Sequence, residues 1–299
     1  MDSNKTFNIS MPKALLDAID KQAEVEFRNR SDLIREAARA YITQKGGMNL
    51  ENRLTKTEES RIKNSFEFAN FSSEPAISIS CAYRPQPNNV KDIFTAGSTA
   101  MKLVENPPKL RDVGGWGLET LDRARPVAGE YLEVNNGKHK LLRLYRDGQH
   151  TFSAGMKFFG HAVNQNIEYP IKFNLLSVAE LITNFVSFSY AMGETLEKEG
   201  SILIFTIAVS NPRAVGKYED ANLTLAAYDG IGVENRGELN LDWAERTITV
   251  RAEDGVTKER AAYLIYSEFC YFFGVRSDEL WYITKNQEID KEVFVRGGR

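Results

Sequence analysis

The sequence is poor in the residues that redox and metal chemistry use. Its 299 residues contain two cysteines and three histidines, which excludes a disulfide-stapled scaffold and a four-cysteine zinc site. Lys plus Arg number 38 and Asp plus Glu 41, for a formal net charge of −3. The chain therefore lacks the basic excess of a dedicated nucleic-acid binder, and any DNA-binding function has to be inferred from pattern.

Long apolar runs are also missing. The longest, residues 202–209, is interrupted by Thr206 and is far shorter than the roughly 20 residues that span a bilayer. The first residues, Met-Asp-Ser-Asn-Lys, lack the apolar core of a signal peptide. These features predict a cytoplasmic protein with no membrane partner. With 42% hydrophobic and 26% charged residues, the composition is that of a folded chain.

The N-terminal segment begins with a strand pattern. Polar and apolar residues alternate strictly over residues 6–11, which is the period of a half-buried strand. The outward face is polar: Thr6, Asn8 and Ser10. The inward face is apolar: Phe7, Ile9 and Met11. A single strand has no partner for its backbone N–H and C=O groups within this segment, so we expect a second copy of the chain to supply one.

Two amphipathic helix patterns follow the strand. Pro12 suits the first turn of a helix over residues 13–26, and Ser31 is placed as the N-cap of a second helix that ends before Gly46. The apolar positions of the two helices complete a predicted dimer core: Leu16, Ile19, Leu33, Ile34 and Ala37. Two helices of this length form too small a core to stand alone, which again favours a dimer.

These residues resemble the ribbon-helix-helix domain of MetJ/Arc/CopG-type DNA-binding proteins. The resemblance rests on Lys5-Thr-Phe-Asn-Ile-Ser-Met-Pro12 and on Arg30-Ser-Asp-Leu-Ile-Arg-Glu-Ala37. It implies an intertwined dimer of βαα chains whose two-stranded ribbon enters the major groove of double-stranded DNA. It also implies two sets of contacts: base readers at Thr6, Asn8 and Ser10, and phosphate contacts at Lys5, Arg28, Arg30 and Ser31. The alternative is a strand-helix-helix unit that only dimerises.

Beyond Gly47 the pattern becomes that of a larger α+β region with an antiparallel sheet. We divide the chain into a ribbon-helix-helix domain at 1–46, a linker or connecting helix at 47–75, and a sensor or interaction region at 76–299, with a further division near 160–175 left open. The elements predicted in the last region are a strand at 77–80, a meander of strands at 130–152, helices at 177–196 and 257–273, and strands at 202–209, 223–227 and 247–250.

The histidines of this region invite a metal-site interpretation, which strand geometry opposes. If Asp147-Gly148 is a hairpin loop, His150 lies opposite Tyr145. His139 is then about 20 Å away along the neighbouring strand, too far to share one ion with it. We therefore predict neither a metal site nor a cofactor.

Two other features of this region leave alternatives open. Cys81 could pair with a histidine as a nucleophile, although a free buried cysteine is the commoner outcome. The aromatic residues of the helix at 257–273 form either core or the wall of an apolar pocket. With no catalytic motif in view, we predict no catalytic residues and a protein that is not an enzyme.

The sequence thus favours a transcriptional regulator, with repression as the expected action. Its N-terminal dimer would bind the major groove, and its C-terminal region would sense an unknown ligand or protein partner. Whether dimers join into a higher oligomer on DNA is left open. A second hypothesis gives the main activity to the C-terminal region, in a DNA-targeted enzyme, an antitoxin or a plasmid-maintenance protein.

Overall fold

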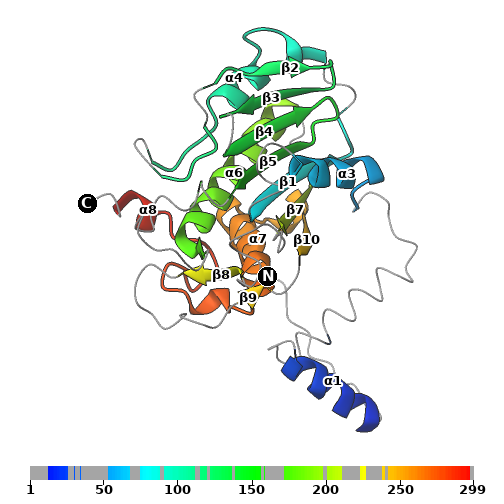
Figure 1. Cartoon of the computed structure of the whole chain (residues 1–299), viewed down its shortest axis with the longest axis vertical. Coiled ribbons are helices and arrows are strands. Elements are labelled where there is room, and N and C mark those ends of the chain that lie inside the picture. The colour runs from blue at the N-terminus through cyan, green and yellow to red at the C-terminus, as the bar shows by residue number, and fades with distance from the viewer. Residues whose placement is uncertain are drawn as a thin grey trace, which may run out of the picture. The chain divides into compact units, whose positions relative to one another are not determined.

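The structure, a computed structural model, is shown in Figure 1. It describes residues 13–25, 30, 34, 53–67, 75–87, 91–111, 115–119, 122–136, 139–155, 158, 172–197, 201–210, 223–226, 238–239 and 242–296. The chain divides into two compact units, residues 1–50 and residues 51–299.

In the first unit the structure describes α1 (Lys13–Val25), which lies where the sequence predicts the first helix. Its Ala23 is buried, and Leu16 and Ile19 are half-buried, as expected for an inward stripe. Ile34 is helical and half-buried as well. The strand predicted at 6–11 lies outside the described residues, and so do the other predicted dimer-core residues: Phe7, Ile9, Met11, Leu33 and Ala37.

The second unit is built on an antiparallel sheet, in which the described strands follow the order β10-β7-β1-β5-β4-β3-β2. These strands are β1 (Ala76–Arg84), β2 (Arg125–Val127), β3 (Tyr131–Asn135), β4 (Lys140–Tyr145), β5 (His150–Gly155), β7 (Ile202–Ser210) and β10 (Trp243–Val250). A small second sheet contains β6 (Lys172–Asn174), β8 (Leu223–Ala226) and β9 (Glu238–Leu239). The predicted antiparallel sheet with helices is confirmed.

Helices pack on both faces of the large sheet (Figure 1). The α-helices are α3 (Lys56–Ser65), α4 (Thr99–Glu105), α6 (Leu175–Thr195), α7 (Lys258–Phe272) and α8 (Glu292–Arg296). Short 3-10 turns are η2 (Lys91–Phe94), η5 (Ala252–Asp254) and η6 (Ser277–Glu279). Helix α3 packs against β1 and β5. Helices α6 and α7 pack against each other, with α6 against β1 and α7 against β7 and β10.

The alternating side chains of β1 explain why helices cover both faces of this strand. Ile77 and Ile79 point into the main core with α6 and α7, while Ser78 and Ser80 point to the opposite face, where α3 lies. All nine residues of the strand are buried. The alternation predicted at 77–80 is therefore present, but both of its faces are covered.

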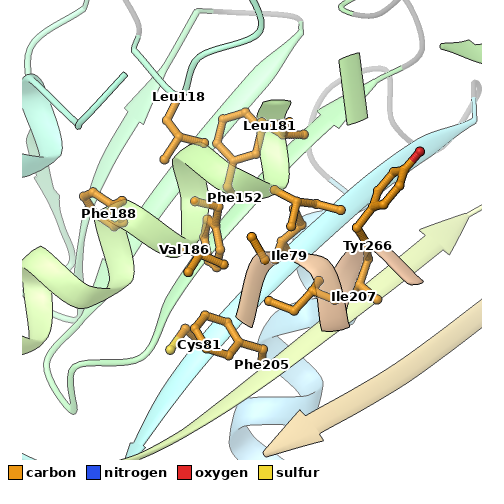
Figure 2. Packing of buried hydrophobic residues seen from close by; sticks show 14 of the residues in the cluster. Ile79, Cys81, Leu118, Phe152, Leu181, Val186, Phe188, Phe205, Ile207 and Tyr266 are labelled. Carbon is orange, nitrogen blue, oxygen red and sulfur yellow. The ribbon is translucent and has the colours of Figure 1, made fainter. Parts of the chain in front are cut away.

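The main core fills the space between the sheet and α6. Figure 2 shows Ile79, Phe152 and Val186 packed together, with Phe205 beside Cys81. Helix α6 is long and apolar enough to cross a membrane by length and composition, but 78% of that stretch is buried within the fold. An apolar helix surrounded by protein is a core helix. Asn174 caps its start by accepting hydrogen bonds from the amides of Leu176 and Ser177.

The aromatic helix α7 contributes to the same core. Tyr263, Tyr266, Phe269 and Phe273 are buried, and Tyr266 and Tyr282 join their hydroxyls in a short hydrogen bond. Tyr271 lies on the outer side. Of the two alternatives left open by the sequence, the structure supports core.

The hairpin between β4 and β5 corrects the predicted register. Tyr145 and Gln149 close the loop through the Tyr145 amide and the Gln149 carbonyl oxygen, so His150 lies opposite Leu144 and not opposite Tyr145. The loop therefore contains three residues, 146–148. The third of them, Gly148, adopts a φ of 79°, as is typical of a three-residue hairpin with a bulge. This one-residue change places the His150 side chain in the core.

Candidate functional site

Most residues predicted to contact DNA lie outside the described part of the chain: Lys5, Thr6, Asn8, Ser10, Arg28 and Ser31. Arg30 is described, and its Nε and Nη2 donate to the two carboxylate oxygens of Asp20 at 2.5 Å each. Asp20 belongs to α1. The hydrogen bond to Asp20 and the charge of that carboxylate raise the pKa of Arg30. A phosphate contact by Arg30 would therefore be shared with Asp20.

The second unit has a concave pocket of about 530 Å³ beside α3. This size lies within the range of small-molecule sites. Its lining comes from α3 and the turn after it, and from the neighbouring strands β3 and β4: Arg61, Asn64, Glu67, Glu130, Tyr131, Arg143 and Tyr145. We call it the α3 pocket. The pocket adjoins β3 and β4, whereas α3 itself packs against β1 and β5.

Arg61 forms one wall of the α3 pocket and is held in place by three groups. Its Nη1 donates to Asp147 Oδ2 at 2.6 Å and to Gln149 Oε1 at 2.9 Å. Its guanidinium lies over the Tyr145 ring, 4.1 Å from the centroid. A stacked and ion-paired arginine of this kind is rigid, and its charge is compensated by Asp147.

Arg143 forms a second wall and is held in the same manner. Its guanidinium lies 4.9 Å from the centroid of the Tyr131 ring, and its Nε donates to Glu133 at 3.0 Å. Glu133 also accepts from Arg125. Burial alone would raise the pKa of Glu133, but the hydrogen bonds from Arg125 and Arg143 outweigh it and lower the pKa. The carboxylate therefore stays ionised beneath the pocket.

The two tyrosines are the flat part of the lining. The ring centroids of Tyr131 and Tyr145 are 5.2 Å apart, with an angle of 54° between the rings. Burial raises the pKa of Tyr145, although Arg143 acts against it. Both residues lie on the face of the sheet that α3 covers, because they alternate with Leu132 and Leu144, which enter the main core.

Helix α3 is fixed at its start by a buried ion pair. Glu58 Oε2 accepts from the Thr55 amide at 2.6 Å, which closes a capping box. The same carboxylate accepts from Arg84 Nη1 at 2.9 Å and Nη2 at 2.5 Å, and from Gln86. Burial would raise the pKa of Glu58, but these hydrogen bonds outweigh it and lower the pKa. These contacts fix the position of α3, and with it the pocket residues that α3 carries.

A cluster of hydroxyls fixes the other end of α3. Ser65 Oγ lies 3.1 Å from Ser78 Oγ and 2.8 Å from Ser153 Oγ, and all three are buried. The segment 47–75, which the sequence leaves open between linker and connecting helix, thus contains a helix that is built into the second unit.

The question of a Cys81 nucleophile is answered by burial. Cys81 lies directly opposite His150 in the β1–β5 pair, and both are fully buried. Burial raises the pKa of the Cys81 thiol far above its usual value and lowers the pKa of His150 to about 4. A neutral thiol beside a neutral imidazole is not an activated nucleophile.

His150 is instead a polar group of the core. Its Nδ1 lies 3.1 Å from the Gly148 carbonyl oxygen and its Nε2 lies 2.7 Å from Ser189 Oγ. A carbonyl oxygen can only accept, so Nδ1 carries the proton and Nε2 is an acceptor. The Ser189 hydroxyl, which also lies 2.9 Å from the Phe185 carbonyl oxygen, shares its single hydrogen between these two acceptors. Phe185 and Phe188 surround the ring at centroid distances of 5.3 and 5.1 Å.

Among the residues that the structure describes, no three or more His, Cys, Asp or Glu side chains are arranged to hold a metal ion.

Comparison with known proteins identifies the N-terminal segment. Residues 5–45 match the family model of ribbon-helix-helix proteins of the copG family. The N-terminal segment is therefore a ribbon-helix-helix domain, as its residue pattern predicts. No curated protein and no solved structure matches the chain. Proteins of this family are generally DNA-binding regulators or antitoxins, so the match supports a DNA-binding role.

The α3 pocket is a site that sequence reasoning missed. Part of its signal was present, because Tyr131 and Glu133 on one strand and Arg143 and Tyr145 on the next repeat with a period of two. The contribution of Arg61 had no such signal, since it depends on how α3 packs on the sheet.

Proposed function

We propose that this protein is a sequence-specific transcriptional regulator that binds double-stranded DNA as a homodimer. The observation that carries the proposal is the match of residues 5–45 to the copG family of ribbon-helix-helix proteins. The polar alternation of Thr6, Asn8 and Ser10 supports a ribbon that reads base edges in the major groove, since such a ribbon fits that groove.

Repression is the action that this arrangement supports best. A protein that occupies the major groove at a promoter excludes other proteins from the same DNA. The dimer gives the binding site a twofold symmetry, so we expect an inverted repeat as the target. Binding upstream of its own gene would make the protein part of a feedback loop.

The second unit is proposed as a region that senses a ligand or a partner. Its size and its continuous core support a folded domain and argue against the short, flexible neutralising arm of an antitoxin. A bare DNA-binding dimer would need only the first unit. The buried Cys81 and His150 serve the core, which favours a binding role over a catalytic one.

The test uses full-length protein and DNA from upstream of its own gene. Fluorescence anisotropy measures binding as each base pair of the bound site is replaced in turn. Asn8→Ala should lose discrimination of about 1–3 kcal/mol at one base pair per half-site, because an asparagine makes two hydrogen bonds to an adenine. Asn106→Ala, an exposed position in the second unit, is the matched control and should leave the profile unchanged.

Two results would contradict the proposal. Equal weakening of Asn8→Ala on every sequence would show that this residue does not read bases. Equal affinity of the wild-type protein for the upstream DNA and for a scrambled fragment would remove the regulator role and leave dimerisation as the use of the first unit.

A further inference from the structure

The net charge of the α3 pocket does not come from its two arginines, because both of them are ion-paired. Arg61 is paired with Asp147, and Arg143 is paired with Glu133, a carboxylate that it shares with Arg125. The other two charged residues of the lining, Glu67 and Glu130, are exposed, and their carboxylates have no hydrogen bond or ion pair in the part of the chain that the structure describes. Among the described residues, the charges of the lining that have no ion pair are therefore the carboxylates of Glu67 and Glu130.

The tyrosine rings of the pocket also restrict the shape of a ligand. Tyr131 and Tyr145 stand 5.2 Å apart between their ring centroids, and each carries a guanidinium on one ring face. Aromatic rings and guanidinium planes both favour planar groups. The amide of Asn64, which also lines the pocket, can donate and accept hydrogen bonds.

From this geometry we propose that the α3 pocket binds a small, flat organic cation, such as an aromatic ring bearing an amidinium or guanidinium group. The planar group lies along the tyrosines, and its N–H groups donate to Glu67 and Glu130. An anion fits less well, because the charge of Arg61 is already paired with Asp147 and that of Arg143 with Glu133, which is only 4% exposed. Removing a buried partner from its ion pair is costly.

The location of the pocket connects it to the proposed function. Helix α3 is the first helix of the second unit, whose chain begins at residue 51, directly after the ribbon-helix-helix unit. A ligand that contacts Arg61 and Glu67 contacts this helix. The claim that the bound cation is the signal sensed by the second unit rests on the proposed function. The binding of the cation itself does not depend on that function.

The experiment measures binding to the full-length protein in the absence of DNA. Three probes share one flat ring and differ in charge: benzamidine is a cation, benzamide is neutral and benzoate is an anion. Isothermal titration at low ionic strength should show saturable binding of benzamidine, weaker binding of benzamide and none of benzoate. Added salt should weaken the binding of benzamidine alone.

Variants of the exposed carboxylates locate the site without endangering the fold. Glu67→Gln and Glu130→Gln should each weaken benzamidine binding by about threefold, which is the effect of one solvent-exposed ion pair, and should leave benzamide binding unchanged. Glu59→Gln, which is exposed on the same helix and does not line the pocket, is the matched control and should change nothing.

Three results would overturn the inference. These are benzoate binding as tightly as benzamidine, unchanged benzamidine binding in the double variant of Glu67 and Glu130, and the lack of saturable binding by benzamidine. Because no DNA is present, each of them leaves the DNA-binding proposal standing. Conversely, a protein that binds benzamidine at this site but no DNA sequence specifically would refute the regulator role and keep the pocket.

Discussion

Acidification should destabilise the second unit through His150. The imidazole is fully buried among aromatic rings, and burial lowers its pKa from an ordinary 6.5 to about 4. The unfolded chain therefore binds a proton near pH 6.5 that the folded protein accepts only near pH 4. The contribution of His150 to the free energy of unfolding is constant above pH 6.5, falls as the pH drops from 6.5 to about 4, and levels off below that range.

The size of the effect follows from the same two pKa values. A tenfold difference in proton affinity is worth about 1.4 kcal/mol, so the interval between 6.5 and about 4 amounts to roughly 3 kcal/mol. Urea unfolding at a series of pH values measures it as a slope. His150→Gln removes the titrating group, so its free energy of unfolding should decline less with acidification than that of the wild-type protein.

The control for this experiment is Asn106→Ala. That residue is exposed and has no titrating side chain, so its removal should keep the wild-type pH dependence. Identical slopes for His150→Gln and the wild-type protein would refute the reasoning. If His150→Gln does not fold, the proton resonances of the wild-type imidazoles give the same answer, because one of the three histidines should remain neutral down to about pH 4. A full set of imidazoles titrating near pH 6.5 would refute it as well.

Two further predictions concern the support of the pocket and the segment over α6. Glu58→Gln should lower the free energy of unfolding by about 3 kcal/mol, because it leaves the buried Arg84 without its partner; the exposed Glu59→Gln should change it little, and equal effects in urea unfolding would contradict the assigned ion pair. Gly115→Ala should lower the Tm more than Gly255→Ala. Both glycines have positive φ, but a Cβ at Gly115 would collide with Glu180 Oε1, whereas a Cβ at Gly255 meets open space. Equal Tm values for these two variants would argue against the close approach of Glu180 to Gly115.

Much of the second unit could be predicted from local pattern. The apolar helix expected at 177–196 is α6 at Leu175–Thr195, and the strand expected at 202–209 is β7 at Ile202–Ser210. Both segments are predominantly apolar, which is typical of elements surrounded by protein, so composition identifies them. Their ends follow from caps, such as Asn174 before α6.

Features that depend on distant partners could not be predicted. The strand expected at 77–80 extends to Arg84, because Glu58, 26 positions earlier, neutralises that arginine in the interior. The burial of His150 depends on a one-residue bulge at Gly148 and on the phenylalanines of α6. Local alternation contains no information on either contact.

For the N-terminal domain, local pattern alone is enough to identify the fold. Its strand alternation and helix starts are sufficient to identify a ribbon-helix-helix domain from about forty residues, and the family match at 5–45 confirms it. The assignment of Thr6, Asn8 and Ser10 as base readers stays a prediction. The pairing of Arg30 with Asp20 is a contact that amphipathic periodicity does not specify.

The most direct test of the central claim is fluorescence anisotropy of the full-length protein on DNA from upstream of its own gene. Scrambled DNA of the same composition and a chain that begins at Gly47 are measured beside it, at several salt concentrations. We predict specific binding by the full-length protein, with an affinity that falls linearly on a log–log plot against salt, and no binding by the shortened chain. Equal binding to both DNAs, or undiminished binding without residues 1–46, would contradict the account.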